Sequence, residues 1–330
     1  NRVIPNINLN WNVTDFLELD YKYGLDYYRD DYEEFIDNQL DILGASSQGG
    51  IDPTVGRLEQ RLREGTLQNS IMSAFLRFGS DDAVSSTTHL AFDWRKESFN
   101  NILARGTGLP PYKPVGLGAA EESIIDQTEE DFATYGILLN QKFEYQGKIG
   151  ASAGVRADYS SAFGQGSDPF IFPRGDVYVR LSEFDFWGAK RSIPEFKVRA
   201  AYGQAGVQPG AFDRIRTLDA GQLGSNGFLA PQTAQTNPLL DVQVSEEFEA
   251  GIDASFTPGG GDRVNGLFPY LRFSLTYWDR TSEDVIRAIG VAPTTGAETL
   301  LDNAITLESE GWQVSLQKTV LSTEGFSWNW

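Results

Sequence analysis

The chain has 330 residues, of which 40% are apolar and 12% aromatic, and it carries a formal net charge of −19 at pH 7. That charge argues against nucleic-acid binding, because a phosphate backbone is held by clustered Lys and Arg. The absence of Cys excludes disulfides and thiolate metal sites in this stretch. No run approaches the ~20 consecutive apolar residues of a membrane-spanning helix.

The first two segments alternate apolar and polar side chains with a period of two, which predicts strands. Between Ile7 and Val13 every second residue is apolar, and the residues between them are asparagines. Leu17–Asp30 repeats the pattern with Tyr and Leu opposed to Glu, Asp and Lys. The three residues 14–16 that join these segments predict a hairpin with a tight connection.

Two segments then interrupt the strand pattern. Asp31–Glu64 is acidic and partly helical in pattern, and Ser98–Glu130 contains three prolines, so both are expected to be long loops. Between them, Thr66–Phe78 and Thr87–Glu97 are expected to be strands joined by Gly79–Ser86.

The next hairpin is the clearest in the chain, because Phe132–Tyr145 and Lys148–Ser160 are joined only by Gln146 and Gly147. About twelve strands are expected in all, in meander order. The later ones are expected at Asp176–Leu181, Glu195–Gly203, Phe248–Phe256, Leu271–Tyr277 and Ala304–Leu321, with loops at Gly206–Gln243, Pro258–Gly266 and Gly290–Asp302, and a final stub from Phe326.

Short connections alternate with long ones along the whole chain, and this asymmetry is typical of membrane β-barrels. Charges at the inward positions indicate a wide interior that is watery or plugged, because a narrow barrel fills its centre with packed side chains. These charges are expected either to hold a plug by ion pairs, which we favour, or to line the transport route. The candidate lumen-facing or plug-facing residues are Arg174, Asp176, Arg180, Arg199, Asp253, Glu308 and Glu310.

Six segments, in this order and spacing, carry a resemblance to a known family: Val155–Gly164, Phe172–Phe184, Phe196–Phe212, Asn237–Asp253, Tyr277–Ala288 and Asp302–Leu316. They resemble consecutive strands in the middle and later part of the barrel of the SusC/RagA family, the TonB-dependent outer-membrane transporters of Bacteroidetes. The resemblance is strongest from Lys148 onward.

The resemblance implies an all-β, transmembrane antiparallel barrel of about 22 strands with a plugged lumen, located in the outer membrane of a Gram-negative cell. Residues 1–330 are then part of one β-barrel domain, with the plug and the N-terminal domains outside this stretch. The implied activity is TonB-dependent import of a glycan or peptide oligomer. The implied partners are TonB, outer-membrane lipid and a surface lipoprotein resembling SusD that closes over the barrel.

An enzyme is not expected. Gly150, Ser152 and Gly154 match the G-x-S-x-G pattern of hydrolases, but that motif needs a strand-to-helix turn and a His base. Here it lies inside an alternating strand, and the only His in the chain is His89. His89 is therefore interpreted as a polar lumen residue.

No cofactor is expected, although one acidic cluster has the oxygen ligands that Ca²⁺ prefers. The cluster lacks the spacing of an EF-hand, so a solvated loop surface is the favoured interpretation. Its members are Asp30, Asp31, Glu33, Glu34 and Asp37. Several Trp residues share the apolar strand face and are interpreted as part of an interfacial girdle; they are drawn from Trp11, Trp94, Trp278, Trp312 and Trp328.

Two other interpretations remain open. A complete barrel of about twelve strands, acting as a passive channel or an autotransporter pore, predicts that Asn1 and Trp330 lie on neighbouring strands. A secreted β-sandwich predicts that the apolar faces pack against one another. No leader opens the chain at Asn1–Ile4 and the last strand stops early, so we expect an internal piece of a longer protein.

Overall fold

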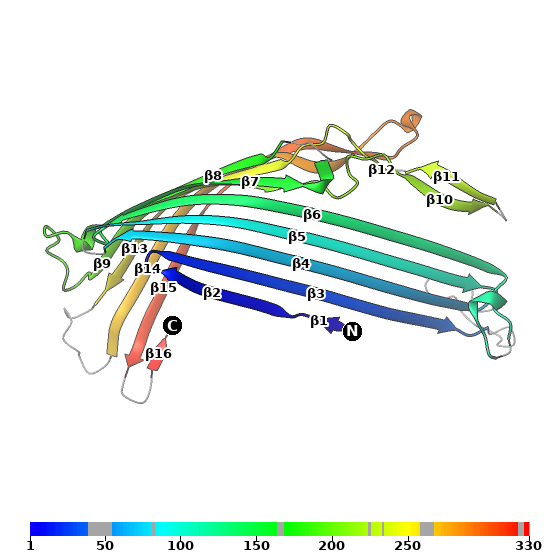
Figure 1. Ribbon diagram of the computed structural model, residues 1–330, viewed down its shortest axis with the longest axis horizontal. Helices are drawn as coiled ribbons and strands as arrows, with labels where there is room; N and C mark the ends of the chain where they lie inside the picture. The colour runs from blue at the N-terminus through cyan, green and yellow to red at the C-terminus, as the bar shows by residue number, and fades with distance from the viewer. Residues whose placement is uncertain are drawn as a thin grey trace. The chain divides into compact units, whose positions relative to one another are not determined.

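The computed structural model describes residues 1–38, 55–80, 83–111, 113–163, 168–223, 226–232, 234–257, 267–322 and 327–329. These residues form sixteen strands and four three-residue 3-10 turns (Figure 1). The strands are β1 (Arg2–Val3), β2 (Asn6–Thr14), β3 (Leu17–Ile36), β4 (Arg57–Gly79), β5 (Val84–Thr107), β6 (Glu122–Tyr145), β7 (Ile149–Ser160), β8 (Phe170–Arg180), β9 (Glu195–Val207), β10 (Leu218–Leu223), β11 (Asn226–Pro231), β12 (Ala234–Gln235), β13 (Gln243–Phe256), β14 (Leu267–Gly290), β15 (Thr299–Ser322) and β16 (Ser327–Asn329). The 3-10 turns are η1 (Leu117–Ala119), η2 (Ser161–Phe163), η3 (Leu181–Glu183) and η4 (Pro293–Thr295).

The long strands form one antiparallel meander, as expected. The order is β1, β3, β4, β5, β6, β7, β8, β9, β13, β14, β15 and β12, with β2 on β3 and β16 on β15. Figure 1 shows β3 to β6 side by side as long arrows, while β10 and β11 form a separate hairpin. The short β12 runs parallel to β15. The alternative of a complete barrel predicted that Asn1 and Trp330 lie on neighbouring strands, and Trp330 lies outside the described residues.

The chain divides into two compact units, and β3 to β6 contribute residues to both. The strands from β7 onward belong wholly to the second unit. The first unit comprises Asn1–Leu9, Tyr21–Ile71 and Asp93–Thr134, and the second comprises Asn10–Asp20, Met72–Phe92 and Tyr135–Trp330.

Strands β3 to β6 are longer than the sequence pattern predicted. The loop expected over Asp31–Glu64 is wrong at both ends, because β3 continues to Ile36 and β4 begins at Arg57. Likewise the loop expected over Ser98–Glu130 is reduced to residues 108–121. The centre of the first loop and all of Pro258–Gly266 lie outside the described residues. At 20 to 24 residues, these strands exceed the roughly 9–11 residues that cross a bilayer.

The β6–β7 connection is the two-residue turn that the sequence predicted. Gln146 has φ 50° and Gly147 has φ 63°, and the Lys148 N–H donates to the Tyr145 carbonyl oxygen at 2.8 Å. Positive φ at both central positions defines a type I′ turn, whose twist matches that of the flanking strands.

The apolar rows of the strands are exposed. Trp11 is 63% exposed, Trp312 is 68% exposed and Val314 is 62% exposed. The β-sandwich alternative predicted that such rows pack against one another, and this prediction is wrong for these residues. Among the described residues, no helix is long and apolar enough to cross a membrane.

A small buried core lies where the β9–β13 connection returns to the sheet. Leu240 and Val242 are almost fully buried, and Phe172 of β8 is also buried. Gly206 of β9 allows this packing, because a Cβ there would meet the Phe172 ring at 2.3 Å and Val242 at 2.8 Å. Close packing of this kind fixes the connection against the sheet.

Candidate functional site

The register of the second unit separates an apolar face from a polar face. One row of directly paired residues crosses six strands, β7, β8, β9, β13, β14 and β15, and is apolar at every position. It consists of Ile149, Val179, Val198, Ile252, Leu275 and Val314. The next row along the strands points to the other face, and it consists of Gly150, Tyr178, Arg199, Gly251, Thr276 and Gln313.

Arg199 ties three strands together on the polar face. Its Nε donates to Asp253 Oδ2 at 3.2 Å and its Nη2 donates to Thr276 Oγ1 at 2.6 Å. Its Nη1 also lies 3.6 Å from Glu249 Oε2. Ser274 Oγ donates to the remaining oxygen of Asp253 at 2.6 Å. The charge of Arg199 is therefore satisfied within the sheet.

A second polar row lies two residues further toward the long loops and contains Asp176 and Glu249. Ser152 Oγ donates to Asp176. Glu249 was not among the candidates predicted from the sequence, although it alternates in phase with Asp253. The row consists of Ser152, Asp176, Ala201, Glu249, Trp278 and Gly311.

The third polar row contains Arg174 and Glu247, separated by Gly203 of β9. On its other side Arg174 is paired with Gly154 of β7. Glu247 forms an ion pair with Arg280, whereas Arg174 has no hydrogen bond or ion pair to the described residues. Glu247 was also missed by the sequence analysis, although it shares the phase of Glu249.

These rows enclose a groove of about 690 Å³ on the polar face. On β6, β8 and β9 it is lined by Lys142, Arg174, Asp176 and Lys197, and on β13 it is lined by Glu247 and Glu249. Because the groove is mixed in charge and lined by long side chains, it is suited to binding polar or charged groups.

The structure places five of the predicted site residues on this polar face: Arg174, Asp176, Arg180, Arg199 and Asp253. The guanidinium of Arg180 lies over the Tyr178 ring, 5.5 Å from its centroid, and the ammonium of Lys197 lies 4.7 Å from the same centroid. Tyr178 in turn donates its hydroxyl to Glu144.

The prediction is wrong for Glu308 and Glu310. Both are in phase with Trp312, and Glu310 shares its row with Asp279 and Phe248, so both lie on the apolar side of the sheet. Tyr277 on that side donates its hydroxyl to Glu310 Oε2 at 2.7 Å. The alternation continued from Trp312 would have placed these carboxylates correctly.

The tryptophans also divide between the faces. Trp312 lies on the apolar face beside Tyr277, at 5.0 Å between ring centroids. Trp278 lies instead on the polar face, over Gly311, where a Cβ would meet the indole at 2.8 Å. The girdle interpretation therefore fails for Trp278, and the side chain of Trp328 lies outside the described residues.

Ser152 and His89 hold no catalytic arrangement with each other. Ser152 lies in the middle of β7 and donates to a carboxylate rather than to an imidazole. The His89 ring stacks on Phe75 at 4.3 Å between centroids, and its Nε2 lies 3.2 Å from Ser73 Oγ.

The first unit contains a buried carboxylate between two arginines. Glu59 is 3% exposed, and it accepts from Arg61 Nη2 at 2.8 Å and from Arg105 Nε at 2.9 Å. The hydrogen bond from Arg61 holds the pKa of Glu59 below its ordinary value, with Arg105 adding to the effect against the opposing effect of burial.

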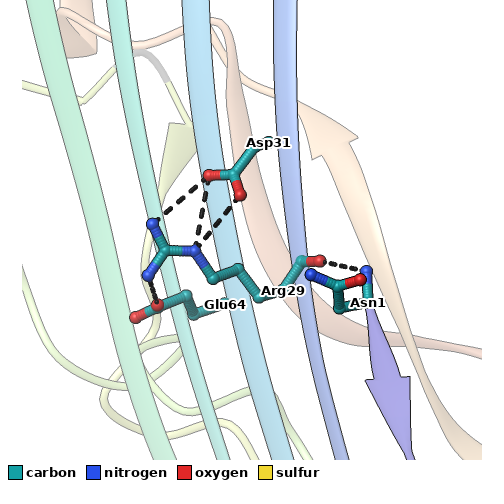
Figure 2. A network of polar contacts seen from close by, with 4 residues as sticks. All are labelled: Asn1, Arg29, Asp31 and Glu64. Atoms are coloured by element: carbon teal, nitrogen blue, oxygen red, sulfur yellow. Dashed lines mark hydrogen bonds and ion pairs between the residues drawn. The ribbon is translucent and has the colours of Figure 1, made fainter.

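Three members of the acidic cluster at the end of β3, Asp31, Glu34 and Asp37, pair with arginine or lysine, and Glu33 accepts a hydrogen bond from Gln60. Figure 2 shows Arg29 between Asp31 and Glu64, with Nη1 3.1 Å from Glu64 Oε1, while the backbone nitrogen of Asn1 donates to the Arg29 carbonyl oxygen at 2.8 Å. Glu34 pairs with Arg57, and Asp37 with Lys113. In the described part of the chain no three His, Cys, Asp or Glu side chains come together in a metal-binding arrangement.

Comparison with known proteins gives consistent matches. A family model described as "TonB dependent receptor-like, beta-barrel" matches residues 2–330. The TonB-dependent receptors P26 and P39 of Formosa agariphila are 28% and 27% identical over 194 and 190 residues, which is 56% of this chain in both cases. The chain spans 18% and 17% of the length of these curated relatives.

Two solved structures show the same fold at lower identity. A structure of the RagAB peptide importer in its closed-closed state matches with a TM-score of 0.80 and 15% identity, over 98% of this chain and 34% of that chain. The outer membrane transporter YddB from Escherichia coli matches with a TM-score of 0.57 and 13% identity, over 97% of this chain and 39% of that chain.

Proposed function

This chain belongs to the TonB-dependent receptor β-barrel family, and we propose that it forms part of the wall of an outer-membrane importer for nutrient oligomers. The observation that carries the proposal is the separation of faces in the second unit. A continuous apolar row from Ile149 to Val314 alternates with rows that contain Arg199, Asp176 and Arg174. Such a sheet meets lipid on one side and a polar interior on the other.

In the proposed importer the short turns lie at the periplasmic end and the long loops at the extracellular end. The strand extensions of β3 to β6 beyond the length of a bilayer then project outside the cell, where they can meet the cargo and a lid protein. Residues 1–330 are one part of the β-barrel domain, and the gating plug is expected in another part of the protein.

The polar-face residues fall into two groups: those whose charges pair with other side chains of the sheet, and those whose charges do not. Arg199 and Asp253 are held by each other and by Thr276 and Ser274, so their proposed role is to keep the wall rigid while facing the plug. Asp176 and Arg180 extend the same surface. No bond-making step and no resident cofactor are assigned to these residues.

The proposed partners follow from the family. TonB would supply energy through segments outside this chain, and a lipoprotein resembling SusD would close the extracellular side. The cargo is proposed to be a peptide or glycan oligomer; the similarity to a protein described as a peptide importer supports the peptide class.

Deletion of the gene tests the proposed function. A strain without it is expected to lose TonB-dependent growth on at least one defined peptide or oligosaccharide source and to regain that growth when the full-length gene is restored. Unchanged growth and uptake on every such source would contradict import. Copurification of the full-length receptor with a lipoprotein resembling SusD tests the partnership separately.

A further inference from the structure

We propose that Arg174 forms a binding site for one oxyanion, a carboxylate, sulfate or phosphate group carried by an imported solute. The site lies on the polar face of β8 inside the groove of about 690 Å³. This inference rests on the proposed function, because it names the chemistry of the cargo that the polar face would meet.

The first argument is the space around the Arg174 side chain. Its paired neighbours on both adjacent strands are glycines, Gly154 and Gly203. A Cβ at Gly154 would lie 2.5 Å from Asn140 Oδ1 and 3.2 Å from Arg174 Nε, so the Arg174 side chain extends over Gly154 beside Asn140. A Cβ at Gly203 would meet nothing closer than Arg174 Cβ at 3.8 Å. Glycine inside a strand weakens it and often marks a place where a ligand approaches the backbone closely. The Gly203 side of the Arg174 side chain is therefore open space that a ligand can enter.

The second argument is that Arg174 is exposed and makes no hydrogen bond or ion pair to the described residues, although its charge acts on nearby His89. The other charges of the groove are engaged. Glu247 pairs with Arg280, and Lys142 lies 3.0 Å from Glu144 Oε2. Asp176 accepts from Ser152, and Lys197 lies over the Tyr178 ring.

An unpaired guanidinium is well suited to one oxyanion, because its planar fork of N–H donors matches the oxygens of a carboxylate, sulfate or phosphate. The carboxylates of Glu247 and Glu249 on the β13 side of the groove would repel a second negative charge nearby. The favoured ligand is therefore a solute with one anionic group flanked by neutral or positive groups, such as an acidic residue in a peptide.

A carboxylate on the plug is the other occupant to consider. Among the charged side chains that line the groove, Arg174 is the one without a hydrogen bond, ion pair or ring contact to the described residues. An occupant therefore needs to bring only one anionic group, and the uptake and conductance measurements below separate a solute from a plug carboxylate.

Crystals of the full-length receptor soaked with selenate test the site, because selenate is an oxyanion with an anomalous signal. The wild-type protein is expected to show an anomalous peak within hydrogen-bond distance of the Arg174 guanidinium. Arg174→Gln is expected to lose the peak. Gly203→Asp is also expected to lose it, because a carboxylate directly across from Arg174 would occupy the guanidinium from within the chain.

Two controls match these variants. Gly203→Asn adds a neutral side chain of nearly the same shape as Asp and is expected to keep the peak. Lys190→Gln removes the same charge from the exposed β8–β9 connection, where Lys190 lies 3.2 Å from Glu183, and is also expected to keep it. A wild-type groove without selenate, or a peak that persists in Arg174→Gln, would overturn the proposal.

Uptake and conductance separate a solute site from a plug contact. For peptides that contain Asp, Arg174→Gln is expected to reduce receptor-dependent uptake about tenfold, the loss of one charge-assisted contact, while uptake of the Asn counterparts stays unchanged. Equal loss for both peptides, or a new ion leak in planar bilayers, would assign Arg174 to the plug and overturn the inference. Absence of any peptide uptake by the wild type would count against peptide cargo, while the selenate result would stand by itself.

Discussion

At the scale of single residues, the polar face of the second unit depends on Arg199. Its guanidinium contacts Asp253, Glu249 and Thr276 on two other strands. Removing it would leave two carboxylates unpaired on one surface, and an unpaired charge costs more than the pair contributes.

Arg199→Met is therefore expected to destabilise the full-length barrel by about 1–2 kcal/mol, a value reduced from that of a buried pair because these side chains are 29–39% exposed. The midpoint of urea unfolding in detergent measures the effect. Arg287→Met is the control, since Arg287 is exposed and has no partner among the described residues, and its midpoint should hardly move. Equal shifts of the urea midpoint for both variants would show that the contacts of Arg199 do not stabilise the barrel.

Glu59 is expected to make the stability of the first unit depend on pH. Its pKa in the folded state is lowered by the hydrogen bond from Arg61 and then by Arg105. A lowered folded pKa means that the stabilisation is fully present above the ordinary glutamate pKa and is lost as the pH falls through the folded value.

The hydrogen-exchange protection factors at the paired ends of β4 and β5, taken relative to the intrinsic rate at each pH, are accordingly expected to be high at neutral pH and to fall below the ordinary glutamate range. Glu59→Gln should have lower protection factors at neutral pH and lose most of this pH dependence, because the charge that couples to the arginines is gone. Glu130→Gln, at an exposed position of the same unit, serves as the control and should behave like the wild type. A pH profile of Glu59→Gln identical to that of the wild type would refute the coupling.

At the scale of elements, adjacent residues of β15 should respond in opposite ways to the same substitution. Val314 belongs to the apolar row and Gln313 to the polar row. Val314→Arg is expected to cost about 2–4 kcal/mol, the penalty of arginine on the lipid face near the midplane. Gln313→Arg should cost much less, because its side chain faces the polar interior. The heat stability of the barrel on gels measures both, and equal losses would be inconsistent with the assigned faces.

In the β6–β7 turn, the energetic cost of a left-handed backbone conformation can be measured without a contribution from steric clashes. Gly147 has φ 63°, and a Cβ there would meet only Arg180 Nη1, at 3.9 Å. Gly147→Ala is thus expected to cost about 1 kcal/mol from the left-handed backbone alone. Gly188→Ala is the control, since Gly188 has open space around its Cβ position and no positive φ. Urea midpoints compare the two, and a Gly147→Ala variant as stable as Gly188→Ala would mean that the turn relaxes.

The sequence predicted these elements unevenly, for physical reasons. The Gln146–Gly147 turn and the alternation in β7 and β13 depend on neighbouring residues, so a period of two revealed them. The end of β3 was missed because its outer part carries charged residues on both faces, Asp31, Glu33 and Glu34. The end of β5 was missed because its residues 98–107 mix polar and apolar side chains without a period of two. Their continuation is fixed by pairing with adjacent strands, which a local pattern does not contain.

For the candidate site, the sequence predicted which residues are charged candidates better than it predicted the face and the row in which each of them lies. Arg174, Asp176 and Arg199 were found because charges alternate with apolar residues in their strands. Glu308 and Glu310 were misassigned, because carboxylates just beyond an apolar band resemble lumen residues in composition and only their phase with Trp312 separates them. The groove around Arg174 was not predicted, since it depends on which residues of β7, β9 and β13 stand in one row.

At the scale of the whole molecule, we propose that the apolar rows meet lipid and that the polar rows meet the interior of an importer. Family membership and the match to the RagAB structure support the fold, and the face assignments supply the physical reason. Because this stretch contains no Cys, single cysteines can be introduced along β14 without altering a native thiol.

Spin-label accessibility along β14 tests this arrangement most directly. Labels at seven successive positions, Leu271 to Tyr277, in the full-length receptor reconstituted into bilayers should alternate with a period of two. Leu271, Phe273, Leu275 and Tyr277 are expected to be accessible to oxygen and shielded from a water-soluble relaxation agent, while labels at Arg272, Ser274 and Thr276 should be shielded from oxygen. If the apolar positions were inaccessible to both agents, they would be packed inside protein and the account would be contradicted.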